Sequence, residues 1–433
     1  MNRILIFNAG ISPIDKRMPS SGVGLRAWQF YQGLKSRGFD AHLSVFKGTY
    51  NKFKKFIPNG FGDIVFDSTL ESQSEVIQKV QPDVIIFTHW PTVLIKYTDI
   101  PVVIDFHGPH ILERYFQKHR THDENIREKL YKIRIGDFFT CAGEYQKYYF
   151  IGWLLRAGVM NIINEKIICD IPISLNSNLP QINYNKKLER PIRFVYSGMF
   201  LPWQDPFNAF EAVSEVFNKN KGGVLEIFGG KHPIHSIDAK KFDDLIKNAK
   251  NNPFIKFRGI IPRDELIEEY KKAHLALDLM SWNLERELAF TTRTVEYLWA
   301  GLPVIYNNYS ELSEYIKRYK AGWCVDPDNP EEIRELLEQI LDNLEQLVEY
   351  SVNAQKLVRE NFTWDKTITP LVEFCKNPKK RDRSSDINFE NSIRVSQEVP
   401  KRGPIERAIQ CYKDNGLKCT VKKVIDYLKV DIR

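Results

Sequence analysis

The chain has 433 residues, enough for two domains with separate cores, and its apolar and charged fractions of 43% and 27% are typical of a soluble globular protein. Its sequence holds no run of the roughly 18 apolar residues that a membrane-spanning helix needs. Six cysteines without a CxxC pair argue against a zinc site or a disulfide framework and predict a reducing, cytoplasmic setting. Residues 379–433 hold fourteen Lys or Arg and eight Asp or Glu, so six of the seven net positive charges lie there. The rest of the chain is near neutral, and we therefore predict no binding to nucleic acid.

The first half of the chain alternates short β-branched runs with apolar helical patterns. Strands are predicted at Arg3–Phe7, Ala41–Phe46, Val84–Phe87, Val102–Asp105, Phe138–Cys141 and Lys166–Ile171. Helices are predicted between many of these strands, for example over Gly24–Arg37 and Ser72–Val80. Such alternation is typical of parallel sheets with right-handed crossovers.

The second half repeats this alternation. Strands are predicted at Ile192–Ser197, Val224–Phe228, Phe254–Arg258, Leu275–Leu279, Val304–Tyr306 and Trp323–Val325. Helices are predicted over Asp264–Ala273 and Pro330–Leu347. Two sets of about six strands predict an α/β protein with two doubly wound, Rossmann-like domains.

Changes of composition mark the limits of these domains. A polar stretch with two prolines, residues 176–191, separates the two sets of strands. A charged stretch poor in apolar residues predicts a linker, and a later stretch with apolar residues at helical spacing between lysines predicts a basic amphipathic tail. The predicted segments are an N-terminal domain (1–178), a C-terminal domain (190–360), a last helix (361–377), a charged linker (378–404) and a helical tail (405–433).

Two places in the first half carry glycines or polar residues where a strand ends. Gly22 and Gly24 open a helix after the first strand, where glycines let a ligand approach the backbone and the positive end of the helix. A flexible loop is the alternative there. Asp105 and His107 end a buried strand, at the edge where open α/β sheets bind ligands. For both residues a structural role is the alternative.

The segment from Glu285 to Ile305 is the strongest candidate for a site. Thr292, Arg293 and Thr294 open a predicted helix, whose free N–H groups and positive dipole end favour a phosphate. Glu296 lies three residues after Arg293 and shares its face of the helix. A carboxylate there is free to accept hydrogen bonds from sugar hydroxyls. The pattern predicts a site for a nucleoside diphosphate.

Three further residues of the second half are candidates for the same site. Gly198 follows the first strand of this half, and Lys231 follows the next strand, where an ammonium group is placed to meet a phosphate. A solvated loop lysine is the alternative. Glu287 precedes the predicted helix, where a second carboxylate is expected to bind ligand hydroxyls. A salt bridge between Glu287 and a neighbouring arginine is the alternative.

With these residues in place, the chain resembles glycosyltransferase family 4, whose members have the GT-B fold of two Rossmann-like domains facing a cleft. The resemblance covers residues 2–364 in the order of elements and is most specific over residues 257–327, which include EYLWAGLPVI. It implies that Glu296 binds the ribose of a nucleotide and that backbone groups around Thr292–Thr294 bind the diphosphate. It also implies that the last helix crosses back to the first domain. Gly22, Gly24 and His107 match the family's N-terminal site.

The chain departs from the family's pattern at two points. Glu287 and Glu296 are separated by eight residues, whereas seven is usual, and the usual Arg and Lys after the first strand of the second half are absent. Arg293, Lys231 and backbone amides are therefore expected to carry more of the diphosphate charge.

The resemblance implies a retaining, metal-independent enzyme that moves a sugar from a nucleotide-diphosphate sugar to a hydroxyl acceptor, with no cofactor besides that donor. The predicted catalytic residues are His107 and Glu287; the predicted donor-binding residues are Gly198, Lys231, Thr292, Arg293, Thr294 and Glu296; the predicted acceptor-side residues are Gly22, Gly24 and Asp105. A sugar-nucleotide epimerase of the same fold is the alternative. A nicotinamide-dependent oxidoreductase is a weaker one, because it needs a fuller glycine fingerprint.

A looser resemblance, to transferases of bacterial surface-polysaccharide assembly, implies a glycan or lipid-linked acceptor of the O-antigen, lipopolysaccharide or capsule type. We expect residues 405–433 to bind an anionic membrane surface, since basic amphipathic helices do so. This would make the enzyme a cytoplasmic, peripheral membrane protein. Packing of the tail on protein is the alternative.

Overall fold

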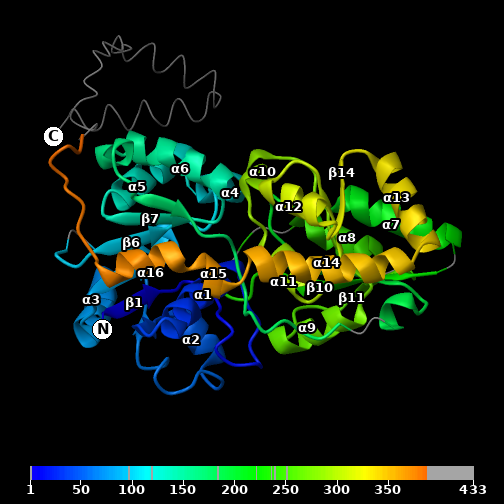
Figure 1. The fold of residues 1–433 in the computed structure, drawn as a ribbon, viewed down its shortest axis with the longest axis horizontal. Coiled ribbons are helices and arrows are strands. Elements are labelled where there is room, and N and C mark those ends of the chain that lie inside the picture. Colours follow the sequence, from blue (N-terminus) through cyan, green and yellow to red (C-terminus); the bar gives the residue numbers. More distant parts are fainter. Residues whose placement is uncertain are drawn as a thin grey trace, which may run out of the picture. The chain divides into compact units, whose positions relative to one another are not determined.

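The computed structural model describes residues 2–387 except positions 96, 97, 119, 183, 184, 221, 236, 238, 239, 250 and 251. The predicted tail (405–433) and most of the predicted linker therefore lie outside the described residues. Residues 1–387 form one compact unit. Within it, two six-stranded parallel sheets lie in sequence, with helices packed on both faces of each sheet (Figure 1).

The first sheet has the strand order β2-β1-β5-β6-β7-β8. Its strands are β1 (Arg3–Phe7), β2 (Asp40–Leu43), β5 (Val84–Phe87), β6 (Val102–Asp105), β7 (Phe138–Cys141) and β8 (Ile168–Asp170). A separate parallel pair is formed by β3 (Val45–Phe46) and β4 (Val65–Phe66). The helices are α1 (Gly22–Ser36), α2 (Lys47–Phe53), α3 (Leu70–Val80), α4 (His110–Gln117), α5 (His122–Ile133) and α6 (Glu144–Arg156), with 3₁₀ turns at Trp90–Thr92 and Met160–Ile163.

The second sheet has the strand order β11-β10-β9-β12-β13-β14. Its strands are β9 (Arg193–Met199), β10 (Val224–Gly230), β11 (Ile255–Phe257), β12 (Leu275–Asp278), β13 (Val304–Asn307) and β14 (Gly322–Val325). Its helices are α7 (Phe207–Asn220), α8 (Lys240–Ala249), α9 (Arg263–Lys272), α10 (Leu284–Leu288), α11 (Thr292–Trp299), α12 (Glu311–Tyr319), α13 (Pro330–Asp342) and α14 (Glu345–Asn361), and a 3₁₀ turn at Asn185–Leu188 precedes the sheet. The prediction of two doubly wound α/β domains is confirmed.

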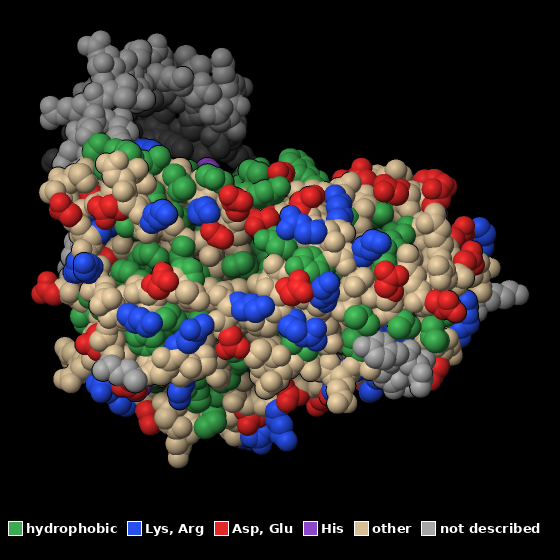
Figure 2. Space-filling view, viewed as in Figure 1, with side chains coloured by type: hydrophobic (Ala, Val, Ile, Leu, Met, Phe, Trp, Pro, Cys, Tyr) green, Lys and Arg blue, Asp and Glu red, His purple; other side chains and the backbone are tan. Residues whose placement is uncertain are grey.

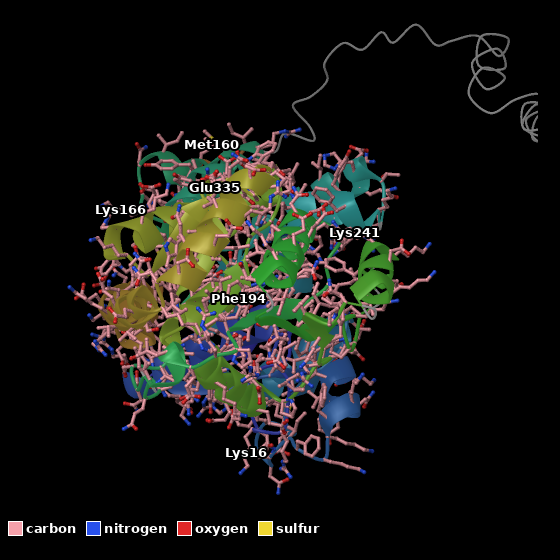
Figure 3. All side chains as sticks on the ribbon, turned by 90° about the vertical axis from the view of Figure 1, so that its right-hand side faces the viewer. Lys16, Met160, Lys166, Phe194, Lys241 and Glu335 are labelled. Atoms are coloured by element: carbon pink, nitrogen blue, oxygen red, sulfur yellow. The ribbon has the colours of Figure 1, made fainter. Side chains whose placement is uncertain are left out.

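Successive side chains along each strand point to opposite faces of the sheet, so an apolar core forms on each face. In β1, Ile4 and Ile6 belong to one apolar cluster and Leu5 and Phe7 belong to another. Burial of successive side chains on opposite faces is what a parallel strand covered by helices requires. In the second sheet, Phe194 of β9 is fully buried among packed side chains, whereas Lys16 lies at the edge of the molecule (Figure 3).

Each of the twelve predicted strands is present, with one change of connection. The predicted strand Ala41–Phe46 is divided at Ser44, whose N–H and hydroxyl both donate to the carbonyl of Ile6. Val45 then turns away and donates to Ile64, which begins the pairing of β3 with β4. The two-residue strand β4 was not predicted, because its apolar run is too short to show a period.

The last helices return to the first sheet. Figure 1 shows α14 along the second domain and α15 (Trp364–Thr367) and α16 (Thr369–Lys376) along the first. Leu371 and Cys375 of α16 pack in the same apolar cluster as Ile4 of β1. The predicted single helix over 361–377 is therefore two short helices, and the predicted helix over Pro330–Leu347 is likewise interrupted, at Asn343 and Leu344.

The first ten residues of the predicted linker are part of the folded unit. Arg381 is 6% exposed and donates to the carbonyl oxygens of Gly136 and Arg134. It also forms an ion pair with Asp386. The prediction of a linker is therefore wrong for residues 378–387. The long side chain of Arg381 donates to backbone carbonyls of the first domain and holds this segment against it.

The described surface is mixed in charge. On the face seen in Figure 2, basic and acidic side chains are interspersed, with apolar side chains between them. Among the helices that the structure describes, every one is too short or too polar to cross a bilayer. The four described cysteines, Cys141, Cys169, Cys324 and Cys375, are free thiols.

Candidate active site

A cleft of about 220 Å³ lies where the carboxyl ends of the two sheets face each other. The strand order reverses between β1 and β5 in the first sheet and between β9 and β12 in the second. Such switch points are where doubly wound sheets bind ligands. One wall is the start of α1 with the loop after β6, and the other is the end of β9 with residues 285–296.

The start of α11 presents free backbone N–H groups to this cleft. Thr291 is the residue before the helix, but its hydroxyl bonds to the phenol of Tyr306, at 2.6 Å, and does not cap the first turn. Thr292, the first helical residue, lines the cleft. The positive end of the helix is thus left for a ligand of opposite charge. Gly301, at φ 75°, ends this segment as predicted.

Arg293 lines the cleft, and its side chain is fixed by contacts with neighbouring residues of the second domain. Its Nη1 donates to the carbonyl of Ser197 at 3.0 Å, and its Nε lies 3.8 Å from Asp278. Its guanidinium also lies over the ring of Tyr196, 5.2 Å from the ring centroid. A buried cation fixed in this way is pre-organised for an anionic ligand, since little side-chain freedom remains to be lost on binding.

Glu296 is also brought into the cleft, together with a cation that the sequence did not identify. The carboxylate is 6% exposed and accepts from Nε and Nη2 of Arg263, at 3.0 and 2.9 Å. Burial raises the pKa of Glu296 above its ordinary value, although Arg263 acts against this shift. The prediction that Arg293 and Glu296 share one face of a helix agrees with their common place in the cleft lining.

Gly198, Gly22 and His107 lie in the same lining. Gly198, at φ 129°, touches Arg293 so closely that a Cβ atom there would lie 2.9 Å from Nη1. Gly22 begins α1, and a Cβ atom on it would lie 3.4 Å both from Nε2 of His107 and from the hydroxyl of Thr292. A side chain at either glycine would therefore intrude on the site.

His107 is in a conformation that a non-glycine residue seldom adopts. Its φ is 55°, in the left-handed region, which costs roughly 1–3 kcal/mol and is found most often at functional sites. Its Nδ1 is buried without a hydrogen-bond partner among the described residues. Burial lowers the pKa of His107, so the ring is neutral near pH 7.

Of the two glutamates Glu285 and Glu287, the structure places Glu285 in the cleft lining, and the predicted place of Glu287 there is wrong. Glu287 accepts from the indole of Trp282 and does not line the cleft. Glu285 is 2% exposed and accepts from Arg286, whose Nη2 lies 2.8 Å from Oε1. Asn283 caps α10, so Glu285 and Glu287 both lie in this helix. Because an α-helix has about 3.6 residues per turn, side chains two residues apart point to nearly opposite sides.

Lys231 and Thr294 also lie outside the cleft. Lys231 is exposed and forms an ion pair with Asp243 at 2.9 Å, and it is not among the residues that line the cleft. The side chain of Thr294 is fully buried and donates to Asp278 beneath the site. Arg286 takes the place expected of Lys231 as a second cation in the lining.

Two predicted acceptor-side residues support the site from beneath. Asp105 is fully buried and accepts from Nη2 of Arg26 at 2.7 Å and from the hydroxyl of Thr140 at 2.6 Å. Gly24 faces the loop after β1, where a Cβ atom would lie 2.0 Å from the carbonyl of Ile11. Their predicted contact with a ligand is therefore wrong, because packing and an internal ion pair occupy both residues.

Glu113 is a further acidic residue that the sequence did not place in the site. It lines the cleft and accepts from Nδ1 of His110 at 2.9 Å. The neighbouring Arg114 forms an ion pair with Glu128. The position of Glu113 in the first turn of α4, directly after β6 and the loop that carries His107, is the signal that would have found it.

Residues 180–357, which include Gly198, Arg293 and Glu296, match the family model described as "Glycosyl transferases group 1". The second domain is therefore similar to the group 1 glycosyltransferases. The matched segment spans the second sheet, and the cleft lies between it and the first domain. A glycosyltransferase of Methanocaldococcus jannaschii, described as uncharacterized, is 22% identical over 216 residues, which are 48% of this chain and 52% of the relative. The chain thus spans about half of the length of this relative.

Solved structures share the fold over nearly their whole length. A sucrose-phosphate synthase of Thermosynechococcus elongatus has a TM-score of 0.64 at 13% identity, covering 87% of this chain and 98% of its own. HepE of Anabaena, in complex with UDP and glucose, has a TM-score of 0.62 at 12% identity, covering 87% and 100%. At these identities the likeness establishes the GT-B fold.

Proposed function

We propose that the protein is a retaining, metal-independent glycosyltransferase that moves a sugar from a nucleotide-diphosphate sugar to a hydroxyl acceptor. The observation that carries the proposal is the meeting of two helix starts, α1 and α11, in one cleft with the Glu296–Arg263 pair. Two positive helix ends favour a diphosphate, and a carboxylate at their side favours ribose hydroxyls. The presence of UDP and glucose in the HepE structure supports this choice of ligand.

The donor would lie mainly against the second domain. Glu296, held by Arg263, would accept hydrogen bonds from the ribose, as the family resemblance implies. The diphosphate would lie at the start of α11, with Arg293 and Arg286 as its cations. Gly198 lets the backbone at the end of β9 approach these groups, because its φ of 129° excludes most side chains.

The same groups would stabilise the leaving diphosphate. When the bond between C1 of the sugar and the β-phosphate oxygen breaks, negative charge grows on that oxygen. Arg293, Arg286 and the N–H groups of α11 are already in place to meet it. The acceptor oxygen would form the new bond to C1 on the same face, and its proton would pass to the departing phosphate. His107 and Glu285 would hydrogen-bond the sugar during this step.

We also propose a lipid-linked glycan as the acceptor, in surface-polysaccharide assembly, and a cytoplasmic enzyme bound to the membrane surface through residues 405–433. The apolar residues at helical spacing and the lysines that flank them in that segment support this proposal. Binding of the full chain and of a chain lacking residues 401–433 to vesicles with anionic lipid would be compared by sedimentation. We expect the deletion to abolish binding; undiminished binding would contradict the membrane proposal and leave the transferase proposal untouched.

The donor is tested first by thermal unfolding of the full chain with UDP, GDP, ADP and their sugars. We expect one base to raise the unfolding midpoint. Labelled donor is then incubated with and without candidate acceptors. Transfer with the anomeric configuration retained, and unaffected by a chelator, supports the proposal. Conversion of the donor sugar without an acceptor would identify an epimerase, and the absence of any nucleotide-dependent shift would contradict the whole assignment.

A further inference from the structure

A second cavity, of about 640 Å³, opens beside the donor cleft. Its volume is within the range of small-molecule sites, about 300–1,000 Å³. It is lined by residues of both domains, including Phe46 and Phe66 of the small β3–β4 pair. His107, Glu113 and Trp203 line both the cavity and the donor cleft. A ligand in the cavity therefore reaches the place where the donor sugar is expected.

Histidines are concentrated around this cavity. Five of the nine in the chain line it: His89, His107, His110, His232 and His235. The ring centroids of His89 and His110 lie 4.4 Å apart, and those of His232 and His235 lie 4.7 Å apart. Burial lowers the pKa of all five, that of His232 to about 4. Near pH 7 these rings are neutral, and a neutral imidazole carries one donor and one acceptor.

The cavity lining has few permanently charged side chains, and most of these already bond to other side chains. Among the lining residues that the structure describes, Arg114 is the one permanent cation. Its Nη1 donates to Glu128 at 2.6 Å, and its Nε donates to Nε2 of His110 at 3.0 Å. Asp67 accepts from Thr69 and Lys47. An anionic ligand would therefore find no uncommitted cation among these residues.

Glu113 is the exception, because one of its oxygens is available. Since Nε2 of His110 accepts from Arg114, its proton is on Nδ1, which donates to Oε2 of Glu113 at 2.9 Å. Burial alone would raise the pKa of Glu113, but the bond from His110 and the nearby charge of Arg286 hold it below its ordinary value. The carboxylate is therefore ionised. Within the described part of the chain no hydrogen bond reaches Oε1, which lies beside Gly108, and Glu113 lines both the cavity and the cleft.

We propose that this cavity binds the uncharged, hydroxyl-rich end of the acceptor, and that Oε1 of Glu113 accepts a hydrogen bond from one of its hydroxyls. The inference rests on the proposed function, which places transfer at this junction. Neutral imidazoles pair with hydroxyls in both directions, and the apolar side chains of Phe46 and Phe66 in the lining suit the C–H groups of a sugar. A carboxylate is a strong acceptor for a hydroxyl and repels a second anion. A free glycan and a lipid-linked glycan would present the same chemistry.

The test uses the full chain saturated with the nucleoside diphosphate that it binds. Affinities are measured by ligand-observed NMR titration for methyl glycosides of glucose, galactose and N-acetylglucosamine, and for the matched glucuronide, galacturonide and glucosaminide. We expect a neutral glycoside to bind more tightly than its anionic or cationic counterpart. Octyl glycosides form a second arm: tighter binding than the methyl forms identifies a lipid-linked source, and equal binding identifies a free glycan.

Glu113→Gln supplies the decisive comparison. It should weaken binding of the preferred neutral glycoside about tenfold, the loss expected for one charge-assisted hydrogen bond. It should leave the uronide unchanged or bound more tightly, because the repelling charge is gone. Glu75→Gln, at an exposed position of α3, is the matched control and should alter neither affinity. Thermal unfolding of both variants checks that the fold is kept.

Three results would overturn the inference. The first is tighter binding of a uronide or of the glucosaminide than of the neutral parent, which would show that the cavity selects charge. The second is the absence of binding by every neutral glycoside. The third is a loss of affinity in Glu113→Gln that is no larger than that in Glu75→Gln. Because nucleotide binding is established beforehand, these results leave the donor assignment standing, and failure to bind any nucleotide is recognised separately.

Discussion

Gly22 and Thr292, the first residues of α1 and α11, face each other across the cleft so closely that a Cβ atom on Gly22 would lie 3.4 Å from the threonine hydroxyl. One helix belongs to each domain. Their positive ends repel each other weakly when nothing lies between them, and both are stabilised by an anion placed there. The two domains are thus arranged to close on a negatively charged group.

Gly22→Ala tests this arrangement. The added methyl group makes ordinary contacts, so the variant should fold, but it occupies the space between the helix starts. We expect transfer activity to fall about tenfold or more, since a displacement of the order of 1 Å in such a site has large effects. Gly152→Ala, in α6 with open space around it, is the matched control. Equal activity of both variants would show that the gap beside Thr292 is not used.

Glu285→Gln tests which carboxylate serves the donor sugar. Glu285 is buried in the cleft against Arg286, so its loss should lower kcat/KM about tenfold or more. Glu287→Gln removes the same charge two residues away, where the carboxylate meets only Trp282 among the described residues. It should alter kcat/KM by less than about twofold, as exposed charges contribute little. The opposite ranking in steady-state kinetics would restore the prediction made for Glu287.

We expect Arg293 both to bind the donor and to stabilise the fold, and these two roles can be tested separately. Arg293→Gln leaves Asp278 buried without its cation, which should lower the free energy of unfolding in urea by about 3 kcal/mol. The double variant Arg293→Gln/Asp278→Asn removes both charges and should regain most of that stability. Donor affinity, measured by calorimetry, should stay low in both variants. Recovery of affinity in the double variant would show that Arg293 acts only as a structural ion pair.

The strands and the position of the cleft follow from the sequence, because both depend on local patterns. Runs such as Val84–Phe87 are buried on both faces and need no distant information to be recognised. The end of a strand and the start of a helix are equally plain in the sequence. The first signal placed Gly198 correctly in the cleft lining, and the second placed Gly22, Arg293 and Glu296 there.

The direction of each side chain was the part that could not be predicted. Lys231 follows the correct strand, but its ammonium group pairs with Asp243, on a helix twelve residues later. Asp105 ends the correct strand, but its partner Arg26 comes from a distant helix. Glu285 and Glu287 differ only in the side of α10 on which they lie, and that depends on the helix beginning at Leu284 after the Asn283 cap. Such choices are decided by tertiary partners.

Acid should weaken the first domain through Glu128. Burial alone would raise its pKa, but hydrogen bonds from Lys132 and Arg114 lower it from 4.5 to about 2. The unfolded chain takes up this proton at a higher pH than the folded one, so the stabilisation is complete above pH 4.5 and is lost as the pH falls toward about 2. In urea unfolding between about pH 6 and pH 3, Glu128→Gln should be less stable at the upper end and show a shallower loss. Parallel pH profiles would contradict this role.

The donor assignment predicts that Glu296 recognises the ribose. Calorimetry would compare the wild type and Glu296→Gln, each with the nucleoside diphosphate that the protein prefers and with its 2′,3′-dideoxy form. We expect the wild type to bind the dideoxy form about tenfold or more weakly, and the variant to bind both forms with the wild type's weaker affinity, because one interaction is removed in either way. If Glu296→Gln binds the ordinary nucleotide as tightly as the wild type does, the nucleotide does not lie against α11 and the account is wrong.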